Sequence, residues 1–261
     1  MVAGIHLGDA GEGCATSPSE RGLRYGAMPL LELRDVDRRF GGILALDGLS
    51  LDIETGEIVG LIGPNGAGKT TAFNVITRLY RPDAGDVDFD GESLLRTPAH
   101  RIVALGIART FQNVELFPTM TVRENVLVGA HARRGSRSID EILEHVGLES
   151  VARRRARGLP FGTLKRVELA RALASGPRLL LLDEPAGGLN HEEVTELADF
   201  IRRLREDYDL TILLVEHHMA LVMGLADRVH VLDFGRTIAT GTPREVQENP
   251  AVVEAYLGAP A

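Results

Sequence analysis

Cysteine and tryptophan are the scarcest residues in this chain of 261 residues. It has a single cysteine, Cys14, and no tryptophan. A lone thiol cannot form an internal disulfide or a multi-thiolate metal site, so we expect a reducing compartment. Hydrophobic residues make up 44% and charged residues 25%, which is ordinary globular composition. The length suits one large domain, or one domain carrying a smaller insert.

Positive charge is also in deficit. The chain has 37 acidic and 29 basic side chains, giving a formal net charge of -8. A role in wrapping nucleic acid would need a local basic patch to overcome this average. The clearest basic run, "ARRRARG" (residues 152–158), is typical of a solvated helix face. We therefore expect no nucleic-acid partner.

Long apolar segments are missing as well. No run approaches the roughly 18 residues needed to cross a bilayer, so we expect any membrane association to depend on a partner. Residues 1–27 are rich in Gly, Ala and Ser and lack the apolar block of a signal peptide. We expect a disordered tail there and a folded domain over residues 28–261, with Met28 as an alternative natural start.

The patterned sequence begins with strands of two kinds. "LLELRDVDRRF" and "ILALDGLSLDI" alternate apolar and polar residues on either side of Gly41 and Gly42, which predicts a β-hairpin. "EIVGLIG", "LLLLDE" and "TILLVEHH" are instead continuous apolar runs, typical of parallel strands buried on both faces. In a doubly wound α/β sheet the carboxyl ends of such strands line one crevice. Residues 63–70, 183–184 and 216–218 should therefore converge.

Helical patterns occupy the intervals. A stripe at helical spacing predicts core packing for one face of "HEEVTELADFIRRLRED"; it comprises Val194, Leu197, Ala198, Ile201 and Leu204. Residues 97–159 show helical patterns without a strong strand and are interpreted as a helical insert. After Asp227 the sequence "RVHVLDFGRTIATG" alternates again, and a short helix is expected near "PREVQENPAVVEAYLG".

The segment "GPNGAGKTT" predicts a phosphate-binding loop between the first apolar run and a helix. It comprises Gly63, Pro64, Asn65, Gly66, Ala67, Gly68, Lys69, Thr70 and Thr71. Its glycines permit backbone conformations that let successive N–H groups surround phosphate oxygens. The helix amino terminus favours the same anion, Lys69 can reach the β- and γ-phosphates, and the Thr70 hydroxyl can bind Mg²⁺. Only one other lysine, Lys165, occurs in the chain, so a compact ammonium at position 69 indicates a specific task.

Two carboxylates follow the leucine run. Asp183 would hold Mg²⁺ through its water shell, and Glu184 would polarise the attacking water as general base. Taken alone, the pair could also be two solvated acids at a strand end. The phosphate-binding loop favours the functional interpretation.

Three further side chains are candidates with open alternatives. His217 could donate to a γ-phosphate or be structural, and Gln112 could sense the metal or water or be a solvated loop amide. Phe40 could stack on a base or belong to the hairpin core.

The phosphate-binding loop, the glutamine, the acidic strand end and the histidine follow the order found in ABC-transporter ATPase subunits, which the chain resembles from Leu30 onward. "LPFGTLKRVELARALASGPRLLLLDEPAGGLN" and "LLVEHHMALVMGLADRV" resemble the ATP-binding subunits of branched-chain amino acid importers. The resemblance implies a P-loop NTPase fold, with a mixed core sheet, an antiparallel β subdomain and a helical subdomain.

Roles are implied by the same resemblance. Phe40 would stack on adenine, residues 63–71 would bind the phosphates of ATP together with Mg²⁺, Gln112 would belong to the loop facing the permease, and Glu184 would be the catalytic base. Two subunits would form a head-to-tail dimer, with each ATP held between one phosphate-binding loop and the partner's signature segment. The usual Leu-Ser-Gly-Gly-Gln signature is replaced here by "LPFGT" (residues 159–163), which lacks the serine. The backbone N–H groups of Gly162 and Thr163 remain to bind phosphate.

The function expected is ATP hydrolysis that drives import of branched-chain or related amino acids. The expected partners are integral-membrane permease subunits, a second identical or different ATPase subunit and, indirectly, a periplasmic or extracellular substrate-binding protein. The chain would then lie peripherally on the cytoplasmic face of the cell membrane. Urea, amides or an envelope lipid are alternative cargoes, and an ABC ATPase acting on nucleic acid or the ribosome is the alternative outside transport.

Overall fold

The computed structural model describes residues 28–112, 114–132 and 137–257. The tail expected over residues 1–27 lies outside the described residues. The strands are β1 (Leu31–Phe40), β2 (Ile43–Ile53), β3 (Ile58–Ile62), β4 (Ala84–Phe89), β5 (Glu92–Ser93), β6 (Ile107–Arg109), β7 (Leu179–Asp183), β8 (Thr211–Val215), β9 (Arg228–Asp233) and β10 (Arg236–Gly241). The α-helices are α1 (Lys69–Ile76), α2 (Ile102–Leu105), α3 (Val122–Ala132), α4 (Ile139–His145), α5 (Phe161–Ala174), α6 (His191–Tyr208), α7 (Met219–Leu225), α8 (Pro243–Gln247) and α9 (Pro250–Leu257).

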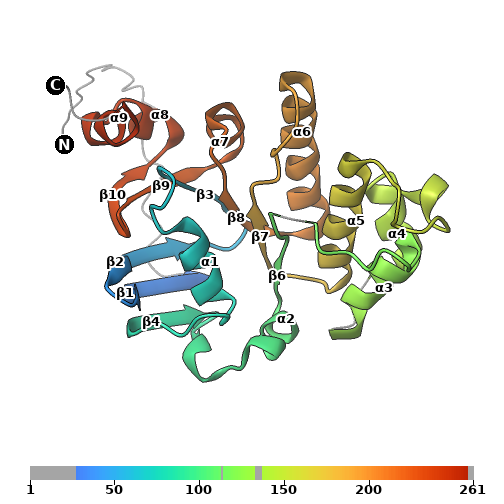
Figure 1. Cartoon of the computed structure of the whole chain (residues 1–261), viewed down its shortest axis with the longest axis horizontal. Coiled ribbons are helices and arrows are strands. Elements are labelled where there is room, and N and C mark those ends of the chain that lie inside the picture. The colour runs from blue at the N-terminus through green and yellow to red at the C-terminus, as the bar shows by residue number, and fades with distance from the viewer. Residues whose placement is uncertain (1–27, 113, 133–136, 258–261) are drawn as a thin grey trace, which may run out of the picture.

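Two sheets organise the fold (Figure 1). An antiparallel sheet has the order β2-β1-β4-β5, and its β1–β2 hairpin turns between Phe40 and Ile43, as the alternating pattern predicted. The larger core sheet has the order β10-β9-β3-β8-β7-β6. Its strands from β9 to β6 are parallel and β10 is antiparallel, so the sheet is mixed.

The leucine run of β7 shows why the core strands are apolar without a break. Leu180 and Leu182 pack into a core formed with α5, α6 and α7 on one face of the sheet. Leu179 and Leu181 pack on the other face, against α1 and the antiparallel sheet. Alternate side chains of a strand point to opposite faces, so a strand covered on both sides needs apolar residues at every position.

The helices cover these faces and extend the molecule at one end. Helix α1 lies between the two sheets, and α3, α4 and α5 form the helical end seen at the right of Figure 1. On α6 the predicted stripe is confirmed, with Val194, Ala198, Ile201 and Leu204 buried. None of the helices in the described part of the chain combines the length and apolar character needed to span a bilayer.

The expectation of a helical insert without a strong strand over residues 97–159 is wrong at its amino-terminal end. Strand β6 (Ile107–Arg109) pairs in parallel with β7 and forms the edge of the core sheet. With three residues it is too short to produce a recognisable apolar run. The helical part follows β6, and it includes α5, which lies beyond residue 159.

Candidate functional site

The phosphate-binding loop connects β3, which ends at Ile62, to α1, which begins at Lys69. Gly68 occupies the N-cap position with φ of 105°, and among the described residues no side chain caps the helix. The first backbone N–H groups of a helix have no partner within the helix, and the helix dipole favours an anion beside them. The sequence therefore folds locally into an anion-binding helix start.

Glycine is required at two loop positions by the neighbouring backbone. A Cβ atom on Gly63 would lie 2.1 Å from the Leu232 carbonyl oxygen, and one on Gly68 would lie 2.5 Å from the Ala45 carbonyl oxygen. The sequence predicted close approach to phosphate. The structure adds that the loop also packs closely against β9 and β2.

Lys69 is buried and turned back onto the loop. Its Nζ donates to the carbonyl oxygens of Gly63 (2.7 Å) and Pro64 (2.9 Å). Burial lowers the pKa of Lys69, while the nearby carboxylates of Glu184 and Asp183 act in the opposite direction. The ammonium thus lies in the field of both acidic candidates from β7.

Asp183 forms a buried ion pair that the sequence did not predict. Its Oδ2 accepts from Arg109 at 2.7 Å, and the two side chains are only 5% and 7% exposed. The same guanidinium donates to Asn74 Oδ1 of α1 at 2.6 Å and lies over the rings of Phe73 and Phe111. Arg109 therefore ties the end of β7 to the helix that follows the phosphate-binding loop. The only sequence signal was its position before Gln112 in "ARTFQ".

Glu184, Gln112 and His217 meet at the carboxyl ends of the parallel strands. Gln112 Nε2 donates to Glu184 Oε2 at 2.7 Å, and His217 Nδ1 lies 3.8 Å from Glu184 Oε1. Glu184 has a left-handed backbone with φ of 47°, which is costly for a residue with a side chain and is found most often at functional sites. The predicted convergence of the three strand ends is present.

The donors beside this cluster fit Mg²⁺. Asp183 supplies a carboxylate, Thr70 an exposed hydroxyl in the first turn of α1, and Gln112 an amide oxygen left free while its nitrogen binds Glu184. The described residues contain no group of three or more His, Cys, Asp or Glu able to hold a metal. Mg²⁺ is usually held by one or two protein oxygens together with substrate phosphates and water, so this sparse set suits it.

Phe40 is 37% exposed at the end of β1, so its alternative place in the hairpin core is wrong. Its ring meets Tyr80 edge to face at a centroid distance of 5.0 Å, and the Arg38 guanidinium lies 4.6 Å from its centroid. These three side chains form an exposed aromatic and cationic surface.

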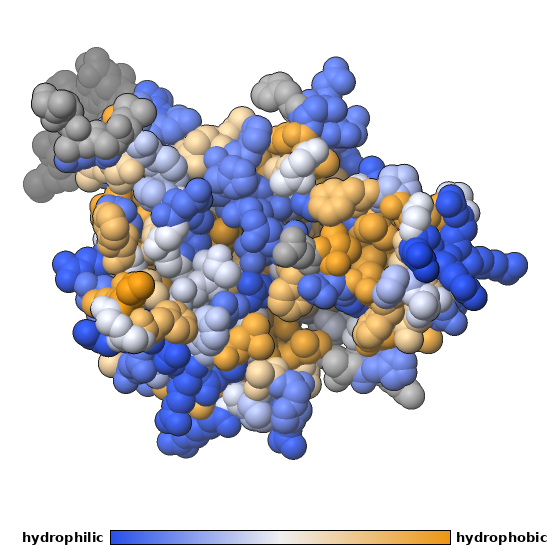
Figure 2. Space-filling view, viewed as in Figure 1, coloured by the Kyte–Doolittle hydropathy of each residue, from blue (hydrophilic) through white to orange (hydrophobic). Residues whose placement is uncertain are grey.

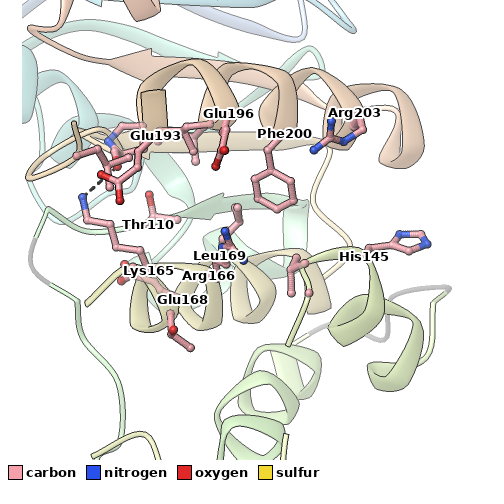
Figure 3. Close-up of a pocket in the computed structure, with 18 of the residues that line it drawn as sticks. Thr110, His145, Lys165, Arg166, Glu168, Leu169, Glu193, Glu196, Phe200 and Arg203 are labelled. Carbon is pink, nitrogen blue, oxygen red and sulfur yellow. Dashed lines mark hydrogen bonds between the residues drawn. The ribbon is translucent and has the colours of Figure 1, made fainter. Parts of the chain in front are cut away.

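Gly162 and Thr163 lie away from the phosphate-binding loop. They occupy the first turn of α5, whose N-cap residue Pro160 makes no side-chain cap. Both line a cavity of about 790 Å³ between α5 and α6 (Figure 3), which among the described residues takes none from the range 63–71. Among the described residues, no hydrogen bond or ion pair joins the start of α5 to the chain's own phosphate-binding loop.

A glycine loop at the start of an uncapped helix, with acidic side chains at the end of a neighbouring parallel strand, is the arrangement of a P-loop nucleotide hydrolase. The comparisons with known proteins agree with this class. A family model described as "ABC transporter" matches residues 46–187, and one described as "Branched-chain amino acid ATP-binding cassette transporter" matches residues 236–261.

Individual relatives cover most of the chain. It is 43% identical to the high-affinity branched-chain amino acid transport ATP-binding protein BraF of Pseudomonas aeruginosa, over 89% of this chain and 99% of BraF. A crystal structure of a nucleotide-free ATP-binding cassette from an ABC transporter superimposes with a TM-score of 0.79 at 30% identity, covering 89% of this chain and 100% of that one. A dimeric ATP-binding cassette in a post-hydrolysis state with ADP and Pi gives a TM-score of 0.72 at 28% identity, covering 82% and 99%. The chain belongs to the ABC transporter family of ATP-binding proteins.

Proposed function

We propose that this protein is the ATP-hydrolysing subunit that powers a membrane permease importing branched-chain amino acids. The observation that carries the proposal is the meeting of Glu184, Gln112 and His217 beside the phosphate-binding loop. The cargo is supported by the similarity to BraF and by the match of residues 236–261 to the branched-chain family model. These similarities favour branched-chain amino acids over urea, amides or envelope lipids, and a transport role over action on nucleic acid or the ribosome.

The loop and its neighbours bind ATP in this proposal. Phe40 stacks on adenine, the N–H groups of residues 63–71 surround the phosphates, and Lys69 exchanges its two loop carbonyls for β- and γ-phosphate oxygens. Thr70, Asp183 and Gln112 would hold Mg²⁺. When bound, Mg²⁺ neutralises charge that develops on the phosphate oxygens.

Glu184 acts as general base on the attacking water. The Gln112 amide fixes one carboxylate oxygen and leaves the other directed toward His217, so the base is oriented before water arrives. His217, which is largely exposed, is free to turn and donate to the γ-phosphate. General-base catalysis contributes roughly 100- to 10,000-fold to rate, so loss of the carboxylate would stop most turnover.

A second ATPase subunit completes each site. The uncapped amino terminus of α5, with Gly162 and Thr163, is exposed and separate from the chain's own loop. In a head-to-tail dimer, the amino terminus of α5 contacts the γ-phosphate of the ATP held by the partner subunit's phosphate-binding loop. A related ATP-binding cassette with ADP and Pi is dimeric, which supports the presence of a second subunit.

The helical end is the proposed permease-binding surface, on the cytoplasmic face of the membrane. Five large apolar side chains in α3, α5 and the segment before α3 are between 37% and 51% exposed; they are Phe111, Phe117, Met120, Leu127 and Phe161. Figure 2 shows apolar surface over α5, one of several apolar areas on this mixed face. A substrate-binding protein would act through the permease and not through this chain.

Uptake of labelled leucine, isoleucine and valine by the source cells tests the proposal. A Lys69→Ala replacement should abolish uptake, because the ammonium that binds phosphate is lost, and the wild-type chain should restore it. Labelled urea serves as the comparison cargo. Unchanged branched-chain uptake in Lys69→Ala cells without a redundant importer would contradict the proposed cargo.

A further inference from the structure

Lys165, the second of the chain's two lysines, binds the loop that follows Glu184. Its Nζ donates from α5 to the carbonyl oxygens of Glu184 (3.2 Å), Pro185 (3.0 Å) and Gly187 (3.1 Å). An ammonium group has three hydrogens to donate, and here all three are used within one turn of chain. Figure 3 shows the Lys165 side chain extending from α5 toward this loop before α6.

Glu216 binds the same loop through a backbone N–H group. It ends the apolar run of β8 and is 0% exposed. Its Oε1 accepts from the Ala186 N–H at 2.7 Å, and its Oε2 accepts from the N–H groups of His217 and His218 at 3.0 Å each. Residues 184–187 are thus hydrogen-bonded both to a cation from α5 and to an anion that follows β8, and the anion also fixes the backbone of His217.

Removing the charges of Lys165 and Glu216 from water costs free energy, which their hydrogen bonds must offset. Burial lowers the pKa of Lys165, while the Glu216, Glu168 and Glu184 carboxylates act in the opposite direction. Glu216 is fully buried and Lys165 half-buried, and a buried charge is stable only when hydrogen-bonded or paired. Lys165 is satisfied by three backbone carbonyls of the loop, whereas Glu216 accepts one N–H from the loop and two from His217 and His218. That loop begins at Glu184, whose left-handed backbone must be held by its surroundings.

We propose that Lys165 and Glu216 are positioning residues that couple helix α5 to the base Glu184 and to His217. This inference rests on the proposed function, in which Glu184 activates water and the α5 amino terminus meets the ATP of the partner subunit. A shift of α5 when that ATP binds would pull three carbonyls of the loop through Lys165. Glu216 would carry the same shift to the backbone of His217. Occupancy of the partner's nucleotide would thereby set the geometry of this subunit's base.

The test separates nucleotide binding from turnover in the full-length chain. Lys165→Met keeps most of the length of the side chain but loses the ammonium, and Arg166→Met removes a cation from the next, exposed position of the same helix. Lys165→Met should lower kcat by about tenfold or more while KM for ATP changes less than about threefold, because the loop and not the phosphate site is disturbed. Arg166→Met should keep the wild-type kcat.

Two more variants keep the test decisive. Glu216→Gln is isosteric and should lower kcat in the same way, so it serves if Lys165→Met does not fold. In the double variant the two losses should not multiply, since both residues hold one loop. A kcat within twofold of wild type in both single variants, or losses that multiply fully, would overturn the coupling.

The proposed function can fail separately. If Glu184→Gln hydrolyses ATP at the wild-type rate, Glu184 is not the base, and the proposed coupling of α5 to that base is wrong as well. If Glu184→Gln is inactive while Lys165→Met and Glu216→Gln keep full kcat, only the coupling is wrong.

Discussion

At the scale of single residues, buried charge in this site is matched to specific partners. Asp183 and Arg109 are both almost fully buried and form an ion pair, and Arg109 also binds Asn74 of α1. Removing one member of a buried pair leaves an uncompensated charge, which costs far more than the pair contributes when intact. Arg109 is therefore expected to support the fold around the metal-binding carboxylate as well as its orientation.

Arg109→Met should lower the free energy of unfolding by about 3 kcal/mol or more, because Asp183 would be left buried without its cation. Urea denaturation of the full-length chain measures this. Arg178→Met is the matched control, since its ion pair with Asp90 joins side chains that are 42% and 58% exposed. An exposed pair contributes about 1 kcal/mol or less, so equal small losses in the two variants would contradict the buried-pair argument.

Functional residues within local sequence motifs were predictable, whereas residues whose partners lie far away in the sequence were not. Lys69 stands within a recognisable loop, and Glu184 ends a conspicuous apolar run. Arg109 and Lys165 are far in sequence from the groups they bind, at separations of 74 residues to Asp183 and 22 to Gly187. No sequence spacing encodes these contacts, because the core sheet and α5 bring the partners together.

At the scale of elements, the helical end depends on close packing of α3 against α5. Gly129 of α3 faces the backbone of α5, and a Cβ atom on it would lie 1.9 Å from the Arg171 carbonyl oxygen. Only a residue without a side chain allows the two helices this separation. The packing of α3 against α5 therefore also fixes the places of Lys165 and of the α5 amino terminus proposed to bind phosphate.

Gly129→Ala should lower the free energy of unfolding by at least about 1–3 kcal/mol, because the added methyl group forces the helices apart. Thermal and urea unfolding measure the loss. Gly162→Ala is the control, since a Cβ atom there meets nothing within 4 Å and its φ is not in the left-handed region. If both variants had similar free energies of unfolding, the two helices would accommodate the added methyl group, and the close-packing argument would be wrong.

Strands and helices with a clear hydrophobic pattern were predicted, whereas short elements were missed. The β1–β2 hairpin, the continuous runs of β3, β7 and β8, and the stripe of α6 all matched the pattern of their burial. Strand β6 has three residues, too few for a period, and it is specified by pairing with β7 instead. The antiparallel strand β4 (Ala84–Phe89) likewise gave no prediction, since only its last four residues alternate polar and apolar side chains.

At the scale of the whole molecule, the proposed function gives the described part of the chain two separate helix starts that bind phosphate, those of α1 and α5, and one base, Glu184. The start of α1 lies beside Glu184, whereas the start of α5 lies across the cavity between α5 and α6. In the proposed head-to-tail pair of subunits, the two kinds of helix start would come together around each nucleotide. ATP would then act both as substrate and as the contact between subunits.

Glu184→Gln tests the central claim most directly, through ATP hydrolysis measured together with the molecular mass of the ATP-bound protein. The account predicts that the variant binds ATP, hydrolyses it at least about 100-fold more slowly than wild type, and accumulates as an ATP-bound dimer. Glu196→Gln, at an exposed position of α6, should keep the wild-type rate and remain monomeric once ATP is consumed. Hydrolysis by Glu184→Gln at the wild-type rate, with no ATP-bound dimer, would contradict the account.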